Sequence, residues 1–303
     1  MEVNKIISHA LQSMPPSKRQ KAFAKDTSKL IHMGLNENNY GMSPKAVAAL
    51  EDSMAGSHFY PDFAAVLLKQ KVAEQYGLKA ENVLTGAGSS AMIDMIGLTF
   101  LDDGDEVLFS APTYGAFADM AYLNGGVPVS VPVTEEQKFN LPAMKEKIGE
   151  KTKIVVICNP NNPTGALYPK EVLQQIVDLA REHQLIIFSD EIYDRLVMDG
   201  LEHVSIASLA PDLFCVTFSG LSKSHMIAGF RIGWMILSGN KAIAKDYIEG
   251  LKMLSNMRLC SNVPAQSVVQ TALGGHQSVN DYIVPGGRIY EQREYVYKAF
   301  CDI

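Results

Sequence analysis

One lysine stands apart in the stretch "TFSGLSKSHMIAGFRIGW", which covers residues 217–234. Lys223 comes just after an apolar run, and small or hydroxyl side chains surround it in the sequence. Such neighbours leave room for a bulky group, whereas a surface lysine more often lies among other charges on an amphipathic helix. A lysine in this setting is typical of a nucleophile that bonds covalently to a carbonyl group.

Polar side chains also follow two other apolar runs. The run "KIVVIC" leads into "NPNNPTG", which contains Asn162, and the run "LIIFS" leads into "DEIY", which contains Asp190 and Tyr193. Ligands of open parallel sheets bind beyond the carboxyl ends of the strands. We therefore expect the amide, the carboxylate and the phenol to lie close to Lys223.

A glycine-rich turn in "LTGAGSSAMIDMIG" (84–97) opens a predicted helix. Free backbone amides and the helix dipole make such a turn an anion site, here centred on Ser89 and Ser90. Arg231, eight positions after Lys223, is able to add a bidentate guanidinium to the same phosphate. The sequence therefore predicts a phosphate cradle beside the lysine.

The collected groups suit pyridoxal 5'-phosphate. A carboxylate keeps the pyridine nitrogen protonated, so that the ring accepts electrons, and a phenol and an amide hydrogen-bond the ring oxygen. Each residue also has an ordinary interpretation: Asp190 as a helix cap, Asn162 as part of a proline turn, Arg231 in a surface ion pair. The cofactor site would be wrong only if all of these ordinary interpretations were true at once, and this favours the cofactor site.

Four motifs in register carry a family resemblance. The motifs "NPNNPTG", "SDEIY", "SGLSK" and "AGFRIGW" resemble those of the class I/II aminotransferases, which are fold-type-I pyridoxal-phosphate enzymes, and the resemblance runs from about residue 30 to residue 298. "LNENNYGMSPKAV", "FYPD" and "APTYGAF" are similar to histidinol-phosphate aminotransferases. "DEIYDRLVMDG", "HVSIASLAPD" and "MLSNMRLCSNVPAQ" are more similar to bacterial alanine-type enzymes.

The resemblance implies a role for each matched residue. Lys223 would hold the cofactor covalently and move the substrate's α-proton, and Asp190 would pair with the pyridine nitrogen. Tyr60 would reach the phosphate of a neighbouring subunit, which implies a homodimer. The other implied contacts are Tyr193 and Asn162 on the ring oxygen, Tyr114 stacked on the ring, Ser89, Ser90, Arg231 and either Ser222 or Ser219 on the phosphate, and Gly34 and Asn36 in the substrate pocket.

Short β-rich runs alternate with helical patterns along the chain. Helices are expected over 63–77 and 169–184, and the alternation predicts an α/β fold with a mainly parallel sheet and helices on both faces. We expect three parts: 1–45 as an N-terminal arm and part of a small domain, 46–245 as the large cofactor-binding domain, and 246–303 as an interdomain helix and the start of a truncated small domain. The expected strands are 106–110, 127–131, 153–158, 185–189, 214–218 and 234–238.

Composition limits the other function classes. Of 303 residues, 47% are hydrophobic and 20% are charged, and the formal net charge of −6 argues against a nucleic-acid or anionic-membrane partner. No apolar run is long enough to span a membrane, and the N-terminus lacks the pattern of a signal peptide. Cys158 and Cys215 lie in apolar runs, as buried reduced thiols do, so a cytoplasmic protein is expected.

The histidines show no metal-ligand spacing, so no metal is expected, and His183 and His225 are expected to be solvated.

Two features depart from the family pattern. Gly220 stands three places before Lys223, where the superfamily often has a phosphate-binding serine or threonine. Family members also continue beyond the position of Ile303 into a segment whose arginine grips the substrate carboxylate. The motif context of that arginine matches none of Arg258, Arg288 and Arg293. These departures predict a truncated product that binds the cofactor but transaminates weakly or not at all.

The leading prediction is an aminotransferase that moves an amino group between an amino acid, or histidinol phosphate, and a 2-oxo acid. A pyridoxal-phosphate-dependent lyase or decarboxylase on the same fold stays open, because the motif around Lys223 is shared among these enzymes. A cofactor-binding remnant without turnover stays open because of the missing arginine. The substrate is not decided by these motifs.

Overall fold

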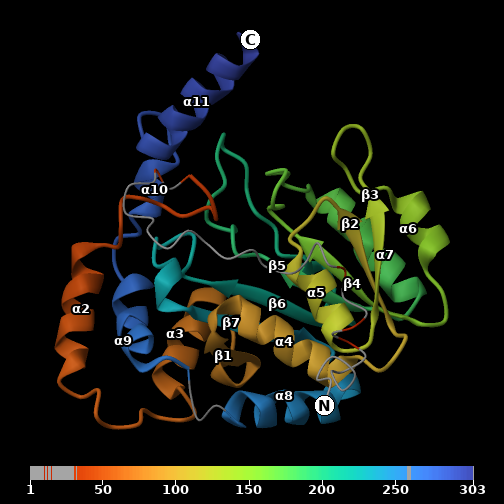
Figure 1. Ribbon diagram of the computed structural model, residues 1–303, viewed down its shortest axis with the longest axis horizontal. Coiled ribbons are helices and arrows are strands. Elements are labelled where there is room, and N and C mark those ends of the chain that lie inside the picture. Colours follow the sequence, from red (N-terminus) through yellow and green to blue (C-terminus); the bar gives the residue numbers. More distant parts are fainter. Residues whose placement is uncertain are drawn as a thin grey trace, which may run out of the picture.

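The protein is described by a computed structural model for residues 33–257 and 261–302 and for the isolated positions 10, 12, 15 and 31. These residues build a seven-stranded sheet with the strand order β1-β7-β6-β5-β4-β2-β3 (Figure 1). Strands β2 to β6 pair in parallel, and β7 runs antiparallel to both β6 and β1. The predicted α/β fold with a mainly parallel sheet is confirmed. The strands are β1 (Val83–Ala87), β2 (Glu106–Ala111), β3 (Val127–Pro132), β4 (Thr152–Cys158), β5 (Ile186–Asp190), β6 (Phe214–Gly220) and β7 (Ile232–Gly239).

Each of the six predicted strands coincides with an observed one to within a few residues. Strand β1 was not predicted, because "VLTGA" contains a glycine and precedes a glycine-rich turn. In the sheet, β1 pairs with β7 so that Gly86 lies opposite Gly233. Two facing glycines remove side chains where the sheet meets the following helix, and this explains why the segment carries a weak strand pattern.

The helices include both predicted ones, α3 at 66–76 and α7 at 170–182. Helix α3 ends at Gly77, whose φ of 64° is a left-handed conformation that favours glycine. Helix α7 begins directly after Pro169, which lacks the amide hydrogen that a helix start leaves unpaired. The helices are α2 (Pro44–Met54), α3 (Val66–Tyr76), α4 (Gly88–Phe100), α5 (Ala116–Leu123), α6 (Leu141–Lys147), α7 (Lys170–Glu182), α8 (Lys245–Met257), α9 (Val263–Ala272), α10 (Val279–Tyr282) and α11 (Arg288–Cys301).

Helices cover both faces of the sheet, as predicted. On one face, α4, α5 and α8 pack over a core that includes Phe188 and Phe218. On the other face, α6 and α7 pack over a core that includes Val155 and Ile187. Helices α2, α3 and α9 continue that second face around Trp234 at the β1 and β7 end of the sheet (Figure 1). Because strand side chains alternate, each central strand supplies apolar residues to both layers.

The structure describes parts of the two segments that lie outside the predicted large domain. Helix α8 packs on α4 and α9 packs on α2, while α11 extends away from the body and buries none of its residues (Figure 1). The division into 1–45, 46–245 and 246–303 remains a prediction. Most of residues 1–45 lie outside the described residues, as do Arg258 and Cys260. The expected absence of a signal peptide concerns this N-terminal part and therefore stays a prediction. Within the described ranges, no helix is long and apolar enough to cross a membrane.

Candidate active site

A cavity of about 780 Å³ lies beyond the carboxyl ends of β4, β5 and β6. It collects most of the residues that the sequence predicts for one site. Leu35, Glu37, Ile192, Ala228 and Gly229 also line it, and sequence reasoning did not select them. The predicted residues in the lining are Asn36, Ser89, Ser90, Tyr114, Asn162, Asp190, Tyr193, Ser222, Lys223 and Arg231.

Three predicted site residues lie elsewhere. Ser219 pairs with Trp234 across the strands, and its hydroxyl is in hydrogen-bonding contact with Tyr76 on the face that α3 covers. Tyr60 is 75% exposed and lies beside a separate surface hollow. Gly34 is exposed and directly precedes the lining residue Leu35. The roles assigned to these three residues remain predictions.

Lys223 faces the backbone of the segment that precedes α2. Its Nζ donates to the carbonyl oxygen of Leu35 at 2.7 Å and to that of Asn36 at 3.3 Å. Burial lowers the pKa of Lys223, the Glu37 carboxylate opposes this shift, and the Arg231 guanidinium reinforces it. A lower pKa increases the fraction of neutral amine, which is the form that acts as a nucleophile or a base.

Asp190 is the last residue of β5 and is 2% exposed. Its Oδ1 accepts a hydrogen bond from the Ile192 amide at 3.2 Å. Burial raises the pKa of Asp190 to about 6, against the opposing effects of that hydrogen bond and of Lys223. A buried carboxylate is stabilised by a cationic partner, and a protonated pyridine nitrogen is one. The site therefore fits the ring of pyridoxal phosphate.

Tyr193 closes the side of the cavity next to the N-terminal segment. Its hydroxyl accepts a hydrogen bond from Asn36 Nδ2 at 2.8 Å. Burial raises the pKa of Tyr193, so its hydroxyl keeps its proton at neutral pH and is able to donate it to a ring oxygen. The contact between Asn36 and Tyr193 was not predicted, because the two residues are distant in sequence.

The residues of the predicted phosphate cradle lie where α4 begins. Helix α4 starts at Gly88, with Ser89 and Ser90 in its first turn. A Cβ on Gly88 would collide with the guanidinium of Arg231, and a Cβ on Gly233 would collide with the backbone of Gly88 and Ser89. Backbone amides and a guanidinium therefore converge, and together they suit a phosphate dianion. Sequence reasoning missed the two glycines, whose signal is the pair of motifs "GAGSS" and "RIGW".

The departure at Gly220 has a structural cause. A Cβ on Gly220 would lie 2.7 Å from the Ile232 carbonyl oxygen and 3.1 Å from Gly233 Cα. The close approach of β6 and β7 therefore excludes a serine or threonine there unless the strands shift. Of the two serines predicted to supply a hydroxyl, Ser222 lines the cavity and Ser219 does not, and a phosphate contact from Ser222 remains a prediction.

Glu191, the residue after Asp190, is a second buried carboxylate. It is 2% exposed, and its Oε1 accepts from the hydroxyls of Ser189 at 2.8 Å and Ser205 at 2.9 Å. His203 Nε2 lies 3.6 Å from Oε2. Burial raises the pKa of Glu191 to about 8. Glu191 does not line the cavity, and its contacts are to Ser189, Ser205 and His203.

The described part of the chain contains no cluster of side chains that forms a candidate metal site. No group of three or more histidine, cysteine, aspartate and glutamate side chains converges there in a way that would hold an ion. The interpretation of His183 and His225 as solvated side chains is wrong. Both are half-buried, and the His225 ring is hydrogen-bonded through both nitrogens.

The mainly parallel sheet, with a lysine, a buried carboxylate and a helix N-terminus at its carboxyl edge, defines the cofactor-binding fold of the fold-type-I pyridoxal-phosphate proteins. When bound, pyridoxal phosphate supplies the carbon that exchanges the amino group and an electron sink that acidifies the substrate's α-hydrogen. The family model for aminotransferase class I and II matches residues 28–302, and the chain belongs to that family.

Two of the curated relatives are named glutamate-pyruvate aminotransferase. Glutamate-pyruvate aminotransferase AlaA of Haemophilus influenzae is 48% identical over 253 residues, which cover 80% of this chain and 63% of that protein. The protein of the same name from Escherichia coli is 50% identical over 225 residues, which cover 74% of this chain and 56% of that protein. The chain thus spans about three fifths of the length of these curated relatives.

Solved structures agree with the fold. A crystal structure of an aminotransferase from Escherichia coli superposes with a TM-score of 0.84 at 42% identity, covering 88% of this chain and 68% of that one. An alanine aminotransferase from Pyrococcus furiosus superposes with a TM-score of 0.81 at 29% identity, covering 88% of this chain and 69% of that one. The predicted family resemblance is confirmed.

Proposed function

We propose that this chain is the cofactor-binding part of an aminotransferase that uses L-glutamate as donor and pyruvate as acceptor. The reaction converts glutamate and pyruvate into 2-oxoglutarate and alanine. The amino group and the α-hydrogen of one acid are exchanged for the carbonyl oxygen of the other, so no external oxidant or reductant is consumed. The names of the relatives at 48% and 50% identity support this substrate pair.

One observation carries the proposal: Lys223 and the buried Asp190 share a single cavity with the α4 N-terminus and Arg231. The lowered pKa of Lys223 suits a base that removes and returns the substrate's α-proton. Asp190 would hold the pyridine nitrogen in its protonated form, and the cradle around Arg231 would fix the phosphate. Tyr193 and Asn162 would hold the ring oxygen, and Tyr114 would stack on the ring.

A homodimer is part of the proposal. Tyr60 is 75% exposed and lies outside the cavity that holds Lys223, as expected of a side chain that serves a neighbouring subunit. We also propose a cytoplasmic location, which the free buried thiols of Cys158 and Cys215 support.

The test is an amino-transfer assay on the protein reconstituted with pyridoxal phosphate. Alanine should form from pyruvate when glutamate is present, at a low rate because the chain lacks the predicted carboxylate-binding arginine, and the Lys223→Ala variant should form none. Histidinol phosphate should be a much poorer donor than glutamate. A clear preference for histidinol phosphate, or alanine formation that survives the loss of Lys223, would contradict the proposal.

A further inference from the structure

The lysine and the tyrosine of the cavity lie on two separate loops, and one side chain outside the cavity joins them. We propose that Gln277 is a positioning residue whose side-chain amide fixes the Lys223 loop and the Tyr193 turn at the same time. Gln277 lies in the connection between α9 and α10 and does not line the cavity. This proposal depends on the proposed function only for the identity of the reaction in which the two loops take part.

All hydrogen-bonding positions of the Gln277 amide are used. Its Oε1 accepts from Arg195 Nη1 at 2.9 Å and lies 3.0 Å from His225 Nε2. Its Nε2 donates to the carbonyl oxygens of Ala272 at 3.0 Å and Gly274 at 3.3 Å. The amide is therefore fixed to the end of α9 on one side and to the two loops on the other.

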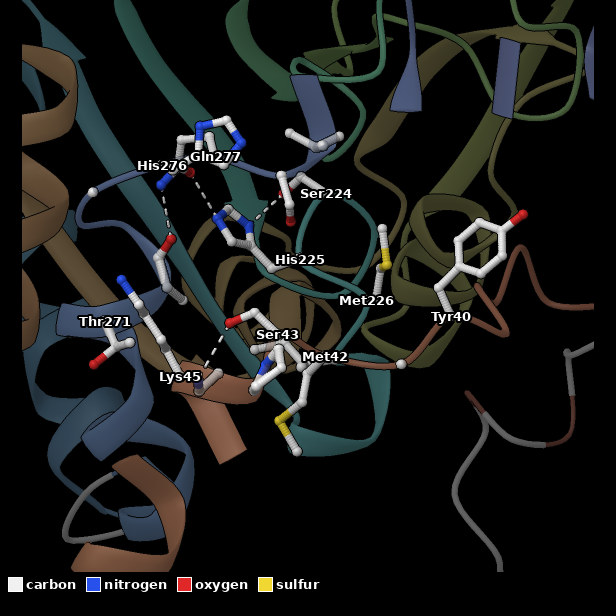
Figure 2. A pocket seen from close by; sticks show the side chains of 18 of the residues that line it. Tyr40, Met42, Ser43, Lys45, Ser224, His225, Met226, Thr271, His276 and Gln277 are labelled. Atoms are coloured by element: carbon white, nitrogen blue, oxygen red, sulfur yellow. Dashed lines mark hydrogen bonds between the residues drawn. The ribbon is translucent and has the colours of Figure 1, made fainter. Parts of the chain in front are cut away.

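The first arm of this network leads to the lysine. His225 follows Lys223 by two positions, and its Nδ1 lies 2.8 Å from the hydroxyl of the buried Ser224. Burial lowers the pKa of His225, so the ring is neutral at neutral pH and carries a single N–H. With that proton on Nε2, the ring donates to Gln277 and accepts from Ser224, which satisfies both ring nitrogens. Figure 2 shows the ring between these two partners.

The second arm leads to the tyrosine. Arg195 lies inside a turn that is closed by a hydrogen bond from the Leu196 amide to the Tyr193 carbonyl oxygen at 2.9 Å. Arg195 is therefore part of the same rigid unit as Tyr193. Fixing its guanidinium on Gln277 fixes the turn, and with it the direction in which the phenol points.

Packing does not replace these hydrogen bonds on the outer side of the Lys223 loop. A cavity of about 580 Å³ lies there, lined by residues that include Tyr40, Ser224, His225 and Gln277 (Figure 2). Close-packed neighbours normally hold a loop in one arrangement. Leu221 and Ile227 anchor the inner side of the loop in the core, and beside the open cavity the amide of Gln277 holds its outer side through the His225 ring.

Hydrogen–deuterium exchange on the protein without cofactor tests the anchor directly. Gln277→Met keeps the length of the side chain and removes its hydrogen bonds. We expect amide exchange to rise by about tenfold in both 193–196 and 222–228. The matched control is Gln270→Met on α9, which also removes a hydrogen bond to a backbone carbonyl, that of Leu67 at 2.8 Å, and should change neither segment.

Variants of the two arms sharpen the test and cover the case in which Gln277→Met does not fold. Arg195→Met should loosen only 193–196, and His225→Phe should loosen only 222–228. Gln277→Glu keeps acceptor oxygens for the two arms but loses the donations to Ala272 and Gly274, so it should raise exchange in both segments by less than Gln277→Met does. Unchanged exchange in folded Gln277→Met, or an equal rise with Gln270→Met, would overturn the proposal.

A second readout uses bound pyridoxal phosphate. The pH midpoint of its absorption change should shift in Gln277→Met and stay at the parent value in Gln270→Met, because only the first variant displaces the lysine and the phenol. A merely structural role would lower stability without moving this midpoint, and that result would overturn the proposal. If the parent binds no pyridoxal phosphate, the proposed function fails, while the exchange experiment still decides the role of Gln277.

Discussion

The side-chain amide of Asn36 donates to the hydroxyl of Tyr193 at 2.8 Å, across 157 positions of sequence. The same N-terminal segment offers the Leu35 carbonyl oxygen to Lys223 Nζ. One short segment before α2 thus contacts the lysine through its backbone and the tyrosine through the Asn36 side chain. Residues 35–37, which lie outside the sheet, complete the wall of the cavity.

A double-mutant cycle measures the contact between Asn36 and Tyr193. Asn36→Ala and Tyr193→Phe should each weaken pyridoxal phosphate binding, and the double variant should lose about 1 kcal/mol less than the sum. The measurement is cofactor affinity from absorbance titration of the four proteins. Asn38→Ala, which removes a contact to the Tyr40 amide in the same segment, is the control and should add independently to Tyr193→Phe. Strict additivity for Asn36 would show that the contact does not affect the cofactor.

Asp190→Ala should slow amino transfer by about a thousandfold, or about 4 kcal/mol of transition-state stabilisation. The physical reason is that a pyridine nitrogen without a carboxylate partner loses its proton and withdraws electrons poorly. Some cofactor should remain bound, because the cradle at Ser89 and Arg231 is intact. Single-turnover kinetics with glutamate gives the rate, with the exposed Asp199→Ala as control. Turnover close to that of the parent would show that Asp190 is only a cap.

Gly220→Ser restores the hydroxyl that the superfamily often has at this position, and we expect it to destabilise the protein by about 1–3 kcal/mol. The new side chain would press on the Ile232 carbonyl oxygen and on Gly233. Gly149→Ser meets nothing within 4 Å and should change stability by less than about 0.5 kcal/mol. Urea unfolding of the two variants gives the comparison. An unchanged free energy of unfolding in Gly220→Ser would mean that β6 and β7 separate easily.

Glu191 should make the stability of the protein depend on pH. Its folded pKa is raised by burial from 4.5 to about 8, so its contribution is fully present below pH 4.5 and is lost as the pH rises through about 8. Glu191→Gln keeps an acceptor oxygen but has no proton to lose. The free energy of unfolding of the parent should therefore fall relative to that of Glu191→Gln between pH 5 and pH 9. Parallel curves for the two proteins over that range would contradict the raised pKa.

Much of the site was predictable because its residues directly follow apolar runs. Asp190 comes directly after one run and Lys223 shortly after another, so the apolar runs alone placed both at the carboxyl edge of the sheet. Ser219 shows the limit of this reasoning. It lies within β6, where side chains alternate, and its pairing with Trp234 directs it to the face covered by α3.

Contacts between distant segments could not be predicted. Gln277 belongs to no motif, and its meeting with Arg195 and His225 depends on where α9 ends against the sheet. The requirement for glycine at position 233 likewise depends on the approach of β7 to the start of α4. Such relationships come from tertiary packing, which a local pattern does not encode.

The most direct test of the central claim is to locate the covalent bond to the cofactor. The protein is incubated with pyridoxal 5'-phosphate, reduced with borohydride, digested and examined by mass spectrometry, with Lys223→Arg treated in parallel. A single pyridoxyl group on Lys223, absent from Lys223→Arg, is the predicted result. A label on another lysine, or no label on a folded protein, would contradict the assignment of this cavity as the cofactor site.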